Sequence, residues 1–182
     1  MKKWIFAIVA MISVIFASCL FVFSDATKAD DTTAKLNLAT LGSYKLDSRL
    51  FETHSIEQSD LSTSKMESYD GLLITADYIH EVDQKRLKEE IRDSKLPVLF
   101  ADFMDKSSVA FSSTELSLQE IEMLDKGEVQ MIYTLPSGEL ATYGIFDTDR
   151  TSLKQLSKAI SKVTKVKDLK EWEIETASML VN

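Results

Sequence analysis

The chain has 182 residues, enough for one domain and a short extension. It carries 29 acidic and 21 basic residues. Every acidic residue follows residue 23, whereas Lys2 and Lys3 precede it, so the chain beyond residue 23 has a net charge of about −10. Binding to nucleic acid depends on neutralising phosphates, so an acidic surface excludes nucleic acid from the expected partners.

Residues 1–29 have the pattern of a bacterial export signal. Lys2 and Lys3 precede an unbroken apolar run from Trp4 to Phe23, and a small, polar stretch follows. With the lysines on the cytoplasmic side, the rest of the chain faces outward. Residues 1–29 are therefore predicted to be an export signal or a membrane anchor, and the protein is expected to be extracytoplasmic.

The sequence leaves three fates open for this segment. Cleavage after Ala26 or Ala29 would release a secreted protein. An uncleaved apolar run of about 20 residues is long enough for a transmembrane helix, and residues 4–23 would then hold the protein on the membrane. The third alternative is lipidation at Cys19, because "FASC" is similar to the lipobox of bacterial lipoproteins.

Cys19 is the only cysteine, so the exported part has neither a thiol nor a disulfide. Cysteine nucleophiles, zinc–thiolate sites and dithiol redox chemistry are excluded there. Residues 30–40 are predicted to be a tether, and residues 41–182 a single extracytoplasmic domain. That domain is long enough to be stabilised by an apolar core alone.

The first half of this domain predicts strands and one helix. "YKLDSRLFETHSI" alternates and indicates a strand over residues 44–53, and "EQSDLSTSKMESYD" indicates a polar loop or short helix. "GLLITADYI" and "PVLFAD" are apolar runs typical of buried strands. Between them, "DQKRLKEEIRDSK" predicts a helix with Leu87 and Ile91 facing inward. Strand, helix and strand over residues 71–101 predict a parallel βαβ unit.

The second half predicts a hairpin and further helices. Ser117 and Glu120 form a capping-box pattern for a helix over residues 118–126, which Gly127 would end. A Pro-Ser-Gly turn joins two strands of a hairpin over residues 128–147. An amphipathic helix is predicted over residues 150–166, and "EWEIET" alternates Trp172 and Ile174 as in a last strand. The predicted fold class is therefore α/β, with a mixed sheet.

Residues 69–100, "YDGLLITADYIHEVDQKRLKEEIRDSKLPVLF", resemble part of a class I glutamine-amidotransferase-like, flavodoxin-like domain. In that family a strand that opens with Asp-Gly leads through a helix to a Pro-Val-Leu strand. The family's second strand runs into a Gly-x-Cys-x-Gly elbow, whereas this chain continues with "ADFMD". The resemblance therefore implies the architecture and carries over no nucleophile.

The stretch "FDTDRTSL", from Phe146 to Leu153, resembles the nucleophile motif of haloacid-dehalogenase-type phosphatases. Only 31 residues follow Thr151, and Arg150 stands where that family has a glycine. The preceding strand is also predicted to belong to a hairpin rather than to a central parallel strand. We therefore interpret Asp149 or Thr148 as the N-cap of the following helix, with no catalytic role.

Acidic residues follow both strands of the predicted βαβ unit. The carboxyl ends of neighbouring parallel strands meet at one edge of a sheet, where ligands commonly bind. Oxygen ligands there could hold a divalent cation or orient a water for hydrolysis. The candidate metal ligands are Asp77, His80, Glu81, Asp102 and Asp105.

No nucleophile–base pair or phosphate-binding loop is visible in the sequence. The sequence therefore predicts a non-enzymatic binding or interaction module that requires no cofactor. Its partner would be a protein or a small-molecule ligand, together with the membrane if the N-terminal segment stays uncleaved. The alternative is a divalent-metal-assisted hydrolase that uses the acidic residues at the strand ends.

Overall fold

The computed structural model describes residues 34–62, 64–104, 106–121 and 127–180. The predicted export signal and its three fates lie outside these ranges. Within them, no helix is both long enough and apolar enough to cross a membrane.

One six-stranded sheet organises the domain, in the order β2-β1-β3-β4-β5-β6. The first four strands pair in parallel, and the last two are antiparallel. This mixed sheet with helices confirms the predicted α/β fold class. The strands are β1 (Leu36–Leu41), β2 (Phe51–Ser55), β3 (Gly71–Thr75), β4 (Val98–Met104), β5 (Gly127–Thr134) and β6 (Leu140–Ile145).

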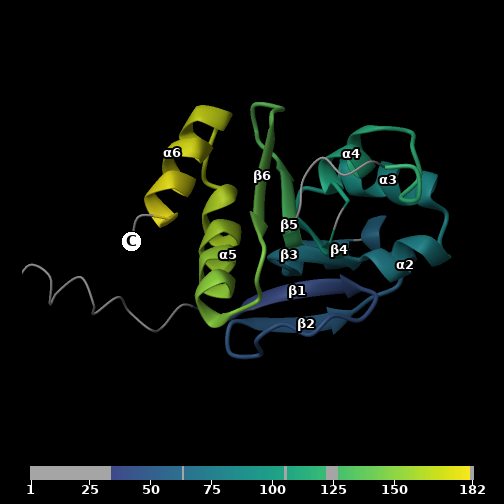
Figure 1. The fold of residues 1–182 in the computed structure, drawn as a ribbon, viewed down its shortest axis with the longest axis horizontal. Helices are drawn as coiled ribbons and strands as arrows, with labels where there is room; N and C mark the ends of the chain where they lie inside the picture. The colour runs from purple at the N-terminus through teal and green to yellow at the C-terminus, as the bar shows by residue number, and fades with distance from the viewer. Residues whose placement is uncertain (1–33, 63, 105, 122–126, 181–182) are drawn as a thin grey trace, which may run out of the picture. The chain divides into compact units, whose positions relative to one another are not determined.

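Helices cover both faces of the sheet (Figure 1). One face carries α5 (Arg150–Val163) and α6 (Leu169–Leu180). The other carries α2 (Ala76–Glu81), α3 (Gln84–Asp93) and α4 (Ser108–Ser113). Two short 3-10 helices, η1 (Gln58–Ser62) and η2 (Ser64–Ser68), lead into β3.

Each face of the sheet has its own apolar core, and β3 contributes to both. All five residues of β3 are buried. Leu73 belongs to the core beneath α5 and α6, whereas Leu72 and Ile74 belong to the core beneath α2, α3 and α4. Strands buried on both faces are typical of parallel sheets, and they explain why "GLLIT" is continuously apolar.

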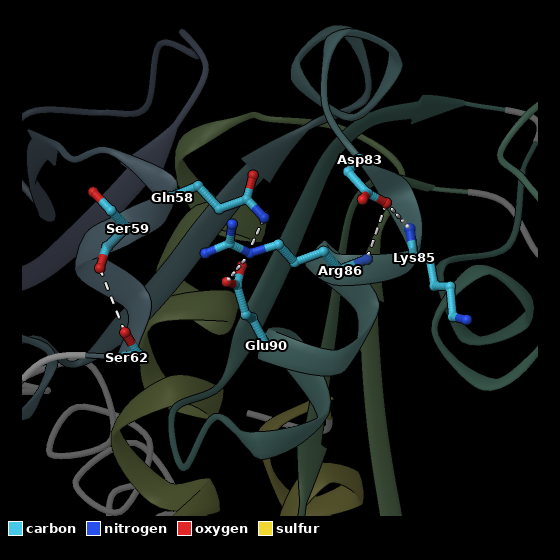
Figure 2. A network of polar contacts seen from close by, with 7 residues as sticks. All are labelled: Gln58, Ser59, Ser62, Asp83, Lys85, Arg86 and Glu90. Carbon is cyan, nitrogen blue, oxygen red and sulfur yellow. Dashed lines mark hydrogen bonds and ion pairs between the residues drawn. The ribbon is translucent and has the colours of Figure 1, made fainter.

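The predicted βαβ unit is confirmed as β3, α3 and β4, and its helix is tightly capped (Figure 2). The Asp83 carboxylate accepts hydrogen bonds from the backbone amides of Lys85 (3.1 Å) and Arg86 (3.2 Å). One turn later, Arg86 Nε donates to Glu90 Oε1 at 3.0 Å, and Gln58 Nε2 donates to Glu90 Oε2 at 2.7 Å. The second of these bonds ties η1 to α3.

The hairpin and the amphipathic helix after it are also confirmed. β5 and β6 pair without a register shift, and Leu153 and Leu156 of α5 are buried. The Asp149 carboxylate accepts from the Ser152 amide at 2.7 Å, so Asp149 is the N-cap. The strand before it is an antiparallel edge strand, which is unlike the central parallel strand of the phosphatases that "FDTDRTSL" resembles.

Two predictions near the start of the domain are wrong in their bounds. β1 begins at Leu36, so residues 36–40 of the predicted tether belong to the sheet. Residues 44–50 form a loop rather than a strand, and β2 begins only at Phe51. The physical reason is a local turn, in which the Asp47 carboxylate accepts from the Arg49 amide at 3.0 Å.

A predicted strand and a predicted helix also have different bounds in the structure, because polar side chains bond to the nearby backbone and start a helix or a turn. The apolar run predicted as a strand to residue 79 leaves the sheet after Thr75, whose Oγ1 accepts from the Tyr78 amide at 3.3 Å and caps α2. Glu120 Oε2 accepts from the Ser117 amide at 3.0 Å, as in the predicted capping box, but residues 118–120 form a turn. The remainder of that predicted helix, residues 122–126, lies outside the described residues. Gly127 begins β5 instead of ending a helix.

The last predicted strand is wrong: "EWEIET" belongs to α6. Trp172 is buried and packs edge-on against Tyr143, with ring centroids 6.5 Å apart, and Met179 is buried two turns later. Ile174 is 61% exposed, so the two apolar residues of the alternating pattern do not share a buried face. Six residues are too few to separate a strand from a helix when their neighbours are strong helix formers.

We expect Gly42→Ala to destabilise the domain more than Gly138→Ala. Both glycines have left-handed backbones, with φ of +90° and +88°, so alanine costs roughly 1–2 kcal/mol at either position. A Cβ at Gly42 would also lie 2.1 Å from Thr75 Oγ1, whereas a Cβ at Gly138 would meet open space. That clash adds about 1–3 kcal/mol. Equal losses in urea unfolding would contradict this packing around Gly42.

Candidate functional site

Three carboxylates and a tyrosine gather where β3 and β4 end and β5 begins. Asp77 lies in the first turn of α2, directly after β3, and Asp102 lies near the end of β4. Glu128 is the second residue of β5, and its Oε1 accepts a 2.8 Å hydrogen bond from the Tyr44 hydroxyl. We call Tyr44, Asp77, Asp102 and Glu128 the acidic rim.

The backbone at the end of β4 is strained. Asp102 and Met104 have φ of 62° and 50°, the only positive values at described residues other than glycine. The pairing of β4 with β5 shifts register between Ala101 and Met104, as at a β-bulge. Aspartate tolerates this conformation, but a long side chain such as Met104 disfavours it, and Met104 is 65% exposed. Backbone strain of this kind often accompanies a functional site.

The charges of the rim repel one another. Burial raises the pKa of Asp102, and the neighbouring carboxylates of Asp77 and Glu128 raise it further. Burial also raises the pKa of Tyr44, together with the hydrogen bond to Glu128, so its hydroxyl keeps its proton. No Lys or Arg among the described residues forms an ion pair with these carboxylates.

The structure brings only part of the predicted metal site together. Asp77 and Asp102 share the rim, and Glu128, which sequence reasoning missed, joins them from β5. His80 Nδ1 instead lies 2.9 Å from Gln119 Nε2, beside the turn at residues 118–120, and Glu81 is exposed at the end of α2. Asp105 lies outside the described residues. Across the described ranges, no three Asp, Glu, His or Cys side chains converge closely enough to hold a metal ion.

A concave site separate from the acidic rim lies on the same face of the sheet as α3 and α4. It has a volume of about 450 Å³, and we call it the α3–α4 groove. Six of its twelve lining residues are apolar and come from α3, α4, the sheet and the loop before β4. A cavity of a few hundred Å³ that combines apolar walls with polar groups is a common form of small-molecule site. The apolar lining residues are Ile91, Leu96, Val98, Val109, Ile132 and Leu140.

A buried lysine holds one wall of the groove in place. Lys88 Nζ donates to the carbonyl oxygens of Thr114 (2.9 Å) and Leu116, in the segment that contributes Glu115 to the groove. The ammonium also lies 4.6 Å from the centre of the Phe111 ring. Burial lowers the pKa of Lys88, and the charge of Arg92 adds to this effect, whereas the charges of Glu115 and Glu120 oppose it. Lys88 therefore positions the segment after α4.

Three polar groups that line the groove have no hydrogen-bond or ion-pair partner among the described residues. The hydroxyl of Ser112 is buried and has no hydrogen-bond partner among the described residues. Arg92 and Glu115 both line the groove and form no ion pair with any described side chain. An unpaired buried hydroxyl costs about 1–3 kcal/mol, so a ligand that bonded to it would recover part of that energy.

A second hollow of about 360 Å³ lies on the other side of the C-terminal end of α3. Only three of its nine lining residues are apolar, and three carboxylates surround it. One of them, Glu90, is already bonded to Gln58 and Arg86 (Figure 2). The α3–α4 groove is larger and has Glu115 as its single carboxylate, so it is the better candidate for an amphipathic ligand with an anionic group.

Sequence reasoning did not find the groove, because its walls come from segments between residues 91 and 140 that only the folded sheet brings together. No short motif marks such a site. Comparison with protein families, curated proteins and solved structures finds no match to this chain.

We expect Asp102→Asn to stabilise the domain near neutral pH. The pKa of Asp102 is raised in the folded state, so the charged form opposes folding, and this cost disappears as pH falls through the folded and then the ordinary aspartate pKa. Asparagine also tolerates a positive φ. Urea unfolding should show a gain at about pH 7 that vanishes near pH 3, whereas Glu81→Gln should change neither value. If Asp102→Asn instead destabilised the domain at neutral pH, the charge of Asp102 would stabilise the folded state, contrary to this prediction.

Proposed function

We propose that this chain is an extracytoplasmic, non-enzymatic binding module, secreted or held on the cell membrane by residues 4–23. Its ligand site is the α3–α4 groove. The single observation that carries this proposal is a groove of about 450 Å³ with six apolar lining residues and an unpaired buried hydroxyl, that of Ser112. The basic, then apolar, pattern of residues 1–29 supports the location.

The charges around the groove favour a ligand that carries an anionic group. Glu115 lies near Lys88, whose ammonium partly offsets the charge of the carboxylate. Arg92 is repelled by the same ammonium and has no acidic partner among the described side chains. The expected ligand is therefore a small amphipathic molecule, with its apolar body against Val109 and Ile132 and its anionic group near Arg92.

The surroundings of the two histidines support binding rather than catalysis. His54 lies 3.6 Å from a Glu52 oxygen and packs against the Tyr69 ring, and His80 contacts Gln119. Neither contact is to a serine or threonine hydroxyl. The Ser107 hydroxyl, which follows β4, accepts from the Ala110 amide and caps α4. A nucleophile–base pair needs direct contact, and the contacts of these side chains among the described residues include no such pair.

The proposal predicts that Val109→Trp abolishes binding of 1-anilinonaphthalene-8-sulfonate, an apolar dye with one sulfonate. The larger side chain would fill the groove, and binding is measured by the fluorescence of the dye in titration. Ile174→Trp is the matched control, because Ile174 is exposed on α6 at the opposite face of the sheet. The native fold of both variants is checked by urea unfolding. Equal dye binding by the two variants would exclude the groove as the site.

The same dye tests the orientation of the ligand. Arg92→Gln should weaken binding of the sulfonated dye while leaving binding of the uncharged N-phenyl-1-naphthylamine unchanged. Arg92→Lys should largely restore binding of the sulfonated dye.

The role of the Ser112 hydroxyl is tested with a matched control. Ser112→Ala and Ser157→Ala each remove a buried hydroxyl that has no partner among the described residues, but only Ser112 lines the groove. A change in dye affinity should therefore accompany only Ser112→Ala.

The alternative function is divalent-metal-assisted hydrolysis at the acidic rim. The observation that favours it is the mutual repulsion of Asp77, Asp102 and Glu128, which raises the pKa of Asp102 and which a cation would relieve by drawing these carboxylates closer together than they lie here. A bound cation could polarise a substrate or lower the pKa of a water. In this alternative the Tyr44 hydroxyl is held in place by Glu128 beside the cation.

This alternative predicts that millimolar calcium, magnesium or manganese raises the melting temperature, because a ligand that binds only the folded state stabilises it by mass action. Asp102→Asn should abolish the rise, and Glu81→Gln should retain it. An unchanged melting temperature in all three metals would contradict the alternative without affecting the groove.

A further inference from the structure

The strand β6 forms an open edge of the sheet. It is last in the strand order and pairs only with β5 among the described strands. Its side chains alternate, with Ala141, Tyr143 and Ile145 buried against the core of α5 and α6. Gly144 is exposed on the other face, and since it has no side chain, its backbone is accessible there. Unpaired backbone groups at a sheet edge can pair with another strand.

This edge lacks the features by which proteins usually block such pairing. Residues 140–146, "LATYGIF", contain no charge and no proline, and β6 pairs with β5 without a bulge. The opposite edge differs, because the five residues of β2 include Glu52 and His54, both exposed. β6 is therefore the edge that is open to a further strand.

An exposed apolar side chain lies at each end of β6, on the same face of the sheet. Leu140 is 41% exposed and Phe146, one residue beyond the strand, is 73% exposed. Both have even numbers, so the alternation of a strand places them on the same face of the sheet as Thr142 and Gly144. Between these apolar ends, the small residues Thr142 and Gly144 leave room for a neighbouring strand.

We propose that two copies of this chain associate through β6, antiparallel about a two-fold axis at Tyr143. In this register Leu140 lies opposite Phe146 of the partner subunit, and Thr142 lies opposite the partner's Gly144. The contact between Leu140 and Phe146 then occurs twice, once at each end of the interface, as an isologous interface requires. The two sheets become one continuous twelve-stranded sheet, and the proposal does not depend on the ligand of the α3–α4 groove.

Charge and size determine how strong this association is. The register places Glu139 opposite the partner's Asp147. At each end of the interface, these two carboxylates therefore repel each other weakly. Both carboxylates are bonded within their own chain: Glu139 Oε2 accepts from the Leu169 amide at 2.9 Å, and Asp147 Oδ1 accepts from the Asp149 amide at 3.1 Å. A single strand is far smaller than the roughly 20–30 residues a side of a standard interface. The dimer should therefore be weak and should strengthen as salt screens the repulsion.

The register is tested by disulfide crosslinking of the full chain in the membranes or medium of expressing cells, with Cys19→Ser as background. The double variant Leu140→Cys with Phe146→Cys should form a covalent dimer on mild oxidation. The two positions are six residue steps apart along the strand, about 20 Å, so an internal disulfide cannot form. Either single variant should stay monomeric on a non-reducing gel, because each position lies opposite the other one.

Single cysteine variants at the centre of β6 distinguish the proposed register from registers shifted along the strand. Dimers from Thr142→Cys alone or from Gly144→Cys alone would mean a register shifted by two residues, and would overturn the pairing of Leu140 with Phe146. In sedimentation of the full chain, Phe146→Lys should abolish the dimer, and adding Leu140→Glu should restore it by placing opposite charges together. A chain that stays monomeric at every concentration and salt, with no crosslink in the double variant, would overturn the proposal.

Discussion

The burial of β3 on both faces is the constraint on which the rest of the structure depends. Its five residues are all buried, and an added Cβ at Gly71 would already meet Leu38, Leu99 and the Pro97 carbonyl. A strand with no solvated face requires a helical layer on each side of the sheet. In the absence of disulfides in the described domain, these two layers and their apolar cores provide most of the stability.

The two layers differ in extent, and this difference produces the surfaces that are available for binding. The layer of α5 and α6 reaches the last strand, where Trp172 packs on Tyr143. The layer of α3 and α4 covers β5 only in part, so Leu140 and Thr142 of β6 are exposed on that side. The α3–α4 groove and the exposed face of β6 therefore adjoin each other. Both exist because the layer of α3 and α4 leaves part of the sheet uncovered. Lys88 maintains its border by bonding to carbonyls beyond α4.

The acidic rim arises from a different constraint, at the end of β4. The bulge there places Asp102 in a left-handed conformation and brings it near Asp77 and Glu128. Repulsion among carboxylates and backbone strain both oppose folding, so the stability of the two cores offsets them. Tyr44 lessens the cost by donating its hydroxyl to Glu128. The rim and the groove lie at different ends of β4, since Val98 lines the groove and Asp102 belongs to the rim.

The sequence by itself determined the elements whose signals are local: the βαβ unit, the Pro-Ser-Gly hairpin, a cap at Asp149 or Thr148, and the amphipathic face of α5. Each depends on the spacing of apolar residues or on a side chain bonded to the nearby backbone. Only the tertiary structure decided that "EWEIET" is helical, that Glu128 rather than His80 joins Asp102, and that segments far apart in sequence form the groove. Those outcomes depend on which surfaces meet, as Trp172 does on Tyr143, and a pattern within one segment carries no information about its distant partner.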